Sequence, residues 1–122
     1  MIPTLLVLAS LMGAAGVVLA AAAAHAAPGA GLDSAAYLLL FHAVAVLGAA
    51  GLAQQGLLWP PAATAAMAGF VLGGTLFAAD VSMRAFAGHR LFPMAAPAGG
   101  TLLIIAWLVL ALAAIVIIVR VR

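Results

Sequence analysis

Four long apolar stretches divide the chain, and the short segments between them contain residues that break helices. The stretches cover residues 4–27, 34–54, 61–87 and 98–119, and a helix needs about 20 apolar residues to cross a bilayer. Pro28 and Gly29 follow the first stretch, Pro60 and Pro61 open the third, and a loop with further prolines separates the third from the fourth. The pattern predicts an all-α integral membrane protein, residues 1–122, folded as one antiparallel four-helix transmembrane bundle with short loops.

Charged residues interrupt the third stretch. At 100° per residue, Gly69, Gly73, Asp80 and Arg84 fall within an arc of about 60° on one helix face. A carboxylate that faced lipid would cost about 2.5 to 3.5 kcal/mol on insertion scales. This face is therefore expected to look toward other helices or a water-filled gap.

Small residues mark the surfaces where helices are expected to meet. Gly69 and Gly73 form a GxxxG pair, and Gly99 and Gly100 open the fourth stretch. Because the first pair shares its face with Asp80, packing within the chain is a better explanation than dimerisation. Close helix packing is the role expected for all four glycines.

A depth comparison suggests that polar groups meet inside the bundle. If the second helix begins near Ser34, with Asp33 or Ser34 as its N-cap, then His42 and Asp80 both lie roughly 10 to 12 Å from the same end. We therefore expect a buried cluster of His42, Asp80 and Arg84, with His25 near its mouth. Such a cluster could handle protons or a polar solute, or it could simply hold the helices in register. The structural role is favoured, because an ion pair at four-residue spacing needs no further partner.

Composition supports membrane insertion and excludes several classes of function. Hydrophobic residues make up 70% of the chain and charged residues 5%, whereas soluble domains have roughly 25% charged residues. Four arginines and two aspartates form no basic patch for nucleic acid. Without cysteine there are no disulfides, and His25, His42 and His89 lie on separate segments without metal-ligand spacing. No metal or other cofactor is expected.

The end groups suggest an orientation. The first stretch ends in small residues that signal peptidase could accept, but no basic residue precedes it and it is long, so an uncleaved helix is the better interpretation. Four crossings place both termini, with Arg120 and Arg122, on one side of the membrane and Arg84 and Arg90 on the other. If Asp80 pairs with Arg84, the balance favours cytoplasmic termini.

Several short motifs carry a resemblance to a known family. AAAAAHAAPGA, AYLLLFHAVAVLG, GTLF and PAGG with a following tryptophan occur in this order over nearly the whole chain. The chain thus resembles the family labelled domain of unknown function 423, small four-helix proteins of the bacterial inner membrane with no established activity. The family pattern has serine where this chain has Asp80. The positions carried over are His25, Tyr37, His42, Gly74, Thr75, Phe77, Pro97, Gly99, Gly100 and Trp107.

No feature of the sequence indicates an enzyme. It has no evident nucleophile with a base, no phosphate loop and no cofactor motif. Trp107 lies in the middle of an apolar stretch, so its indole N–H needs an acceptor, for which a carbonyl or Thr75 would serve. Two functions remain. The first is a non-enzymatic accessory or assembly protein that packs against a larger membrane complex or a second copy; the alternative is a transporter or channel for protons or a small solute.

Overall fold

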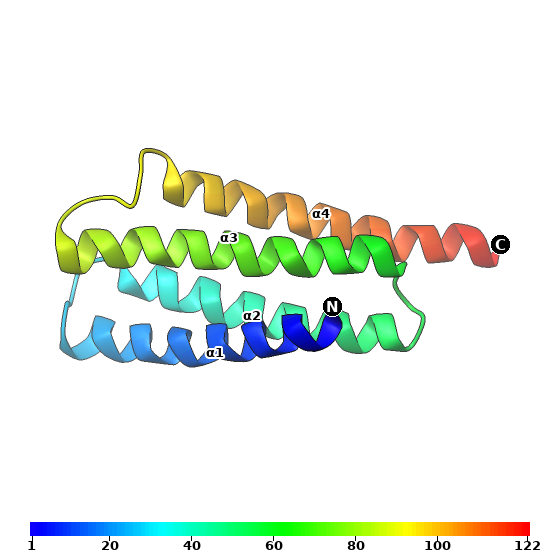
Figure 1. Ribbon diagram of the computed structural model, residues 1–122, viewed down its shortest axis with the longest axis horizontal. Coiled ribbons are helices and arrows are strands. Elements are labelled where there is room, and N and C mark those ends of the chain that lie inside the picture. The colour runs from blue at the N-terminus through cyan, green and yellow to red at the C-terminus, as the bar shows by residue number, and fades with distance from the viewer.

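Four helices and no strands make up the computed structural model, which describes all 122 residues. They are α1 (Ile2–His25), α2 (Leu32–Gln54), α3 (Pro60–Ala87) and α4 (Ala95–Val121). Each is long and apolar enough to cross a membrane, as the sequence predicts. Successive helices run in opposite directions, so both termini lie at the end where α2 joins α3 (Figure 1). We call this the terminal end, and the opposite end, with the other two loops, the loop end.

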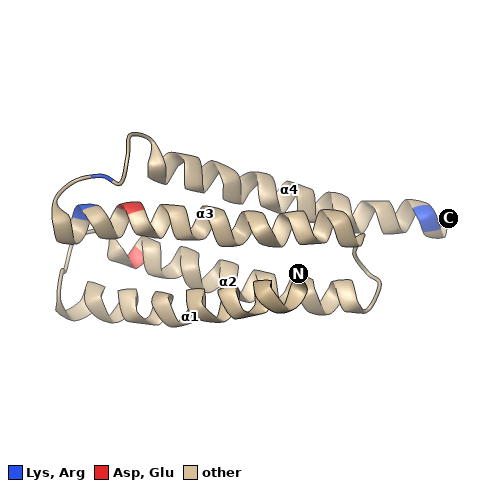
Figure 2. Ribbon diagram, viewed as in Figure 1, with Lys and Arg blue, Asp and Glu red and all other residues tan.

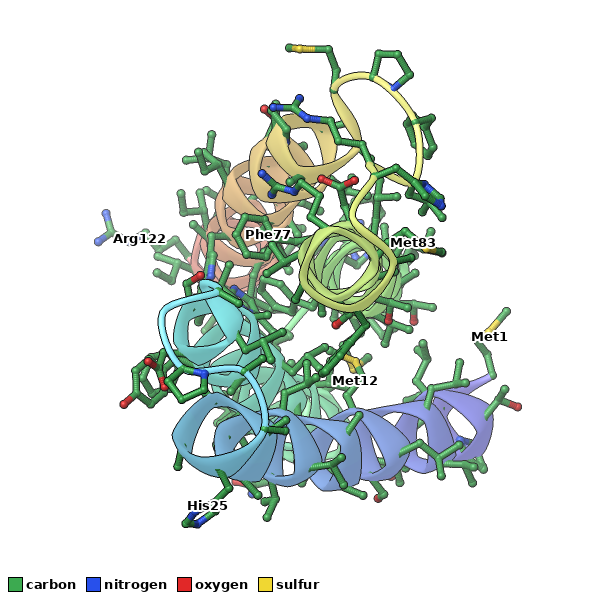
Figure 3. The ribbon with its side chains drawn as sticks, turned by 90° about the vertical axis from the view of Figure 1, so that its left-hand side faces the viewer. Met1, Met12, His25, Phe77, Met83 and Arg122 are labelled. Carbon is green, nitrogen blue, oxygen red and sulfur yellow. The ribbon has the colours of Figure 1, made fainter.

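The helices are arranged in space in the order of the chain. α2 and α3 pack against each other, α1 packs mainly against α2, and α4 packs mainly against α3. Viewed from the loop end, α1 runs obliquely beneath the other helices (Figure 3). Since α1 has little contact with α3, the arrangement is open on one side, unlike a bundle in which every helix has two close neighbours.

Two helix boundaries differ from the prediction in ways that matter for the interior. α2 begins at Leu32, two residues before the predicted start at Ser34, because Gly31 takes the left-handed conformation, with φ of 82°, that turns the chain into the helix. Neither Asp33 nor Ser34 caps it; the Ser34 hydroxyl donates to the Gly31 carbonyl at 2.8 Å. α4 begins at Ala95, three residues earlier than predicted.

The α3–α4 interface is close because its facing residues are small. A Cβ atom on Gly69 would lie 2.8 Å from the Cβ of Ala106, and one on Gly73 would lie 2.8 Å from the Gly99 carbonyl oxygen. A Cβ on Gly99 would in turn lie 2.7 Å from the Gly73 carbonyl oxygen. The backbones of the two helices thus approach each other directly, as small residues allow in membrane proteins. Gly100 differs from the prediction, since a Cβ there would meet no atom within 4 Å.

At the terminal end, α4 is also held to the start of α3. The backbone N–H of Trp59, the N-cap of α3, donates to the Ala113 carbonyl at 2.9 Å. The Arg120 guanidinium lies over the Trp59 ring, 5.4 Å from its centroid. A cation–π contact of this kind stabilises by roughly 0.5 to 1 kcal/mol where it is exposed.

Candidate functional site

Asp80 is the most deeply buried charged side chain. It lies on α3, and its exposed fraction is 0%. Its Oδ1 atom accepts a hydrogen bond of 2.8 Å from the backbone N–H of Leu91, in the loop between α3 and α4. Its Oδ2 atom is buried without a hydrogen-bond partner. One oxygen of the carboxylate thus holds the loop against α3, and the other receives no hydrogen bond.

Arg84 lies beside this carboxylate but forms no hydrogen bond with it. Its Nη2 atom lies 3.5 Å from Asp80 Oδ2, and its side chain is 41% exposed. Charge-assisted hydrogen bonds between such groups are about 2.7 to 2.9 Å long. The two groups therefore attract each other, while the guanidinium keeps donors for another acceptor.

Both residues contribute to a pocket at the loop end, which we call the Asp80 pocket. It has a volume of about 510 Å³ and lies between the last turns of α3 and the first turns of α4. Arg90, from the connecting loop, and Thr101, from α4, also line it. Both acidic residues of the chain lie toward this end, whereas arginines occur at both ends (Figure 2).

His42 belongs to a different group of contacts. Its Nε2 atom accepts a hydrogen bond of 3.1 Å from the indole N–H of Trp107 on α4. Its Nδ1 atom lies 2.7 Å from the Leu38 carbonyl oxygen. An indole N–H can only donate, so the ring is neutral with its proton on Nδ1, which donates to Leu38. The Phe70 ring packs beside both, with centroids 5.3 Å from His42 and 4.8 Å from Trp107.

The structure does not gather the predicted polar residues into one cluster. His42 lies ten residues beyond the start of α2, about 15 Å along the helix, whereas Asp80 lies seven residues before the end of α3, about 10 Å. The earlier start of α2 accounts for part of this difference. His42 therefore bonds to Trp107, while Asp80 pairs with Arg84 and the loop. His25 is exposed and points away from the other helices, so it is not at the mouth of a shared site (Figure 3).

The partner of Trp107 differs from both acceptors that the sequence suggested. Thr75 lies on the other side of α3, where it lines a groove between α1 and α3. Depth could have identified the true acceptor, since Trp107 lies twelve residues into α4, about 18 Å from its start and close to the level of His42. The bond from the Leu91 amide to Asp80 could not have been predicted in this way, because the sequence of a loop does not show where its backbone N–H groups point.

The histidines lie far apart in the fold. His25 is at the end of α1, His42 is inside, and His89 is in the α3–α4 loop with its Nδ1 atom 3.0 Å from the Arg90 carbonyl oxygen. No group of three or more His, Cys, Asp or Glu side chains is placed to hold a metal ion.

The groove between α1 and α3, which we call the lateral groove, has a volume of about 630 Å³ and ten hydrophobic residues among the twelve that line it. Its α1 wall extends from Leu8 to Leu19 and its α3 wall from Val71 to Ser82. Each wall is thus about 16 Å long, or three helical turns. Met12 points from α1 toward α3 within this region (Figure 3).

Comparisons with family models, with curated proteins and with solved structures found no match to this chain.

Proposed function

We propose that the chain is a non-enzymatic accessory or assembly protein that packs against another membrane protein. The observation that carries this proposal is the lateral groove, which leaves one side of α3 uncovered by α1. An apolar groove three turns long matches the contact that a transmembrane helix makes with its neighbours. The accessory protein would receive one helix of its partner there.

The residues on the α3 side of the groove favour a helix over lipid as its occupant. Thr75, Ala79 and Ser82 recur at helical spacing along this wall. Small and hydroxyl side chains are enriched where membrane helices meet, because they permit close approach and can bond across the interface. Lipid-facing surfaces such as the outer face of α4 instead carry Ile104, Leu108 and Ile115, which are all exposed.

Transport of protons or a small solute has less support. A path through the interior would need a continuous series of polar groups across the membrane. His42 and Asp80 instead bond to separate partners at different depths. Both ring nitrogens of His42 are already hydrogen-bonded, so it could accept a proton only by losing the bond from Trp107. These contacts are those expected of groups that hold helices together.

The proposed location is the bacterial cytoplasmic membrane, with both termini in the cytoplasm. The family resemblance and the apolar helices support the membrane, and the arginines support the orientation. At the loop end Asp80 lies beside Arg84, while Arg120 and Arg122 at the terminal end face no acidic residue. Positive residues near helix ends favour the cytoplasmic side.

Photo-cross-linking in native membranes tests the proposed function. A photoreactive residue in place of Thr75 should trap a second membrane protein, and the complex should survive purification in mild detergent. Ala79→Trp should abolish the cross-link by filling the groove. The matched control places the same photoreactive residue at Ala111, which is exposed on α4 and outside the groove; it should trap no protein.

Three results would count against the accessory role. Cross-linking of Thr75 to lipid alone would mean that the groove is a lipid-facing surface. Cross-linking only to a second copy would mean that the chain assembles with itself. Proton or solute flux from the purified chain in liposomes, lost in an Asp80→Asn variant, would establish the transport alternative.

A further inference from the structure

Hydrogen-bonding groups in the Asp80 pocket are left without partners from the chain. The buried Oδ2 atom of Asp80 receives no hydrogen bond. The guanidinium of Arg84 stays 3.5 Å from it, beyond the usual length of a charge-assisted bond. The guanidinium of Arg90 lines the same pocket and forms no salt bridge. The pocket therefore offers two cationic donors and one anionic acceptor.

A ligand that satisfies all three groups must carry both an anion and an N–H donor. Guanidinium groups match phosphate oxygens, often with two parallel hydrogen bonds. A primary ammonium has three donors and suits the carboxylate oxygen. Inorganic phosphate alone would draw Arg84 away from Asp80 and leave a buried carboxylate without a compensating charge, which is costly.

We propose that the Asp80 pocket binds the phosphoethanolamine headgroup of a phospholipid. The phosphate accepts hydrogen bonds from Arg84 and Arg90, and the ammonium donates to Asp80 Oδ2. The pocket volume of about 510 Å³ is within the range of small-molecule sites. Ile104 on α4 lines the pocket too, and gives the start of an acyl chain an apolar neighbour.

The depth of Asp80 matches the depth of a headgroup. α3 has 28 residues and is therefore about 42 Å long, against about 30 Å for the hydrocarbon core of a bilayer. If α3 is centred, about 6 Å extends beyond each face, and Asp80 lies about 4 Å inside the hydrocarbon edge. The charged pocket thus meets the level at which lipid headgroups join their acyl chains.

Access to the buried carboxylate oxygen requires neighbouring side chains to move, and Arg84 is one that can do so. Asp80 Oδ2 is covered by surrounding atoms, and Arg84 is its cationic neighbour. Because the Arg84 side chain is 41% exposed, its guanidinium can turn toward a phosphate with little loss of packing. Leu91 keeps its bond to Oδ1 throughout, so the loop stays in place.

Native mass spectrometry of the purified chain in detergent tests the proposal with three lipids of identical acyl chains. Phosphatidylethanolamine should bind about tenfold more tightly than phosphatidylcholine, whose quaternary ammonium has no N–H, since a hydrogen bond to a charged group contributes about 1.5 kcal/mol or more. Phosphatidylglycerol, which has the phosphate but no ammonium, should also bind more weakly than phosphatidylethanolamine. Equal affinity for all three lipids would overturn the proposal.

Variants of Asp80 and Arg90 test which residue binds the ammonium of the headgroup and which binds its phosphate. Asp80→Asn keeps an oxygen for the Leu91 amide but loses the charge. The affinities for phosphatidylethanolamine and phosphatidylcholine should therefore become nearly equal. Arg90 is exposed and forms no salt bridge, so Arg90→Gln should leave folding intact; it should weaken the binding of all three lipids alike. Arg122→Gln, at the opposite end, is the matched control and should change nothing. If Arg90→Gln behaves like Arg122→Gln, the site is wrong even where Asp80→Asn fails to fold.

A soluble competitor separates the lipid from a free phosphate ester. O-phosphoethanolamine carries the same two charged groups without acyl chains. It should compete only at concentrations far above those of the lipid, because it lacks the apolar contact. Binding as tight as that of the lipid would overturn a lipid ligand in favour of the soluble ester. The measurement uses the chain alone, so its outcome is independent of whether a partner protein occupies the lateral groove.

Discussion

Individual polar side chains in this protein form hydrogen bonds that link one segment to another. His42 joins α2 to α4 through Trp107, and Asp80 joins α3 to the loop that leads into α4. Each of these bonds satisfies a group that would be costly to leave unpaired in an apolar interior. Their net contributions are modest, because interhelical hydrogen bonds in membrane proteins average about 0.6 kcal/mol.

Replacing Trp107 with phenylalanine tests the bond to His42. Trp107→Phe keeps an aromatic ring beside Phe70 but removes the indole N–H, so the chain should lose about 1 kcal/mol of stability. Reversible unfolding of the purified chain in mixed micelles would measure the loss. In a His42→Leu background the same substitution should cost clearly less. Additive effects of the two changes would mean that the bond contributes nothing.

At the scale of helices, glycine position decides how closely α3 and α4 approach. Gly73 and Gly99 face each other across the interface, where any side chain would meet backbone atoms. Gly100 is the next residue on the same helix, yet it faces open space. Neighbouring positions in α4 therefore have opposite requirements, which the repeated glycines in the sequence do not distinguish.

The pair Gly99 and Gly100 provides an internally matched test of this interface. Gly99→Ala should destabilise the chain by about 1 to 3 kcal/mol, since its Cβ would lie within 3 Å of backbone atoms of Gly73 and Phe77 that cannot rotate away. Gly100→Ala should be neutral, or stabilising by up to about 1 kcal/mol through helix propensity. Thermal unfolding in detergent would compare the two variants. Equal effects would contradict the assigned contacts.

Helical periodicity and apolar length predicted the elements well, because these signals depend on residues near one another in the chain. They correctly placed Gly69, Gly73 and Asp80 toward the protein interior, whereas Arg84, predicted to share that buried face, is 41% exposed. They missed the bond between Trp107 and His42 although the two residues lie at similar depths, because depth alone does not specify which faces of α2 and α4 meet. The openness between α1 and α3 depends on how helices tilt, which local patterns do not specify.

For the molecule as a whole, charge distribution and helix order set orientation and available surface. Antiparallel helices bring the two termini to one end, together with Arg120 and Arg122 (Figures 1 and 2). The loop end has Arg84 and Arg90, with Asp80 beside Arg84. The two ends differ little in net positive charge, so the orientation in the membrane should be sensitive to the loss of single arginines.

Topology reporters fused to the C-terminus should detect this sensitivity. In the natural sequence the fused reporter should be cytoplasmic. Replacing Arg120 and Arg122 with glutamine should give a mixed population, because the arginine excess then moves to the loop end. Arg90→Gln should instead strengthen the cytoplasmic placement. A periplasmic reporter in the natural sequence would reverse the assigned orientation.

The two halves of the fold are fastened very differently. α4 is tied to α3 by the Asp80 bond to the loop at one end and by the Trp59 bond at the other, whereas no side-chain hydrogen bond joins α1 to another helix. Polar bonds therefore hold α4 to α3, whereas α1 is held to α2 by apolar packing alone. A helix that entered the lateral groove could therefore separate α1 from α3 without breaking a side-chain hydrogen bond.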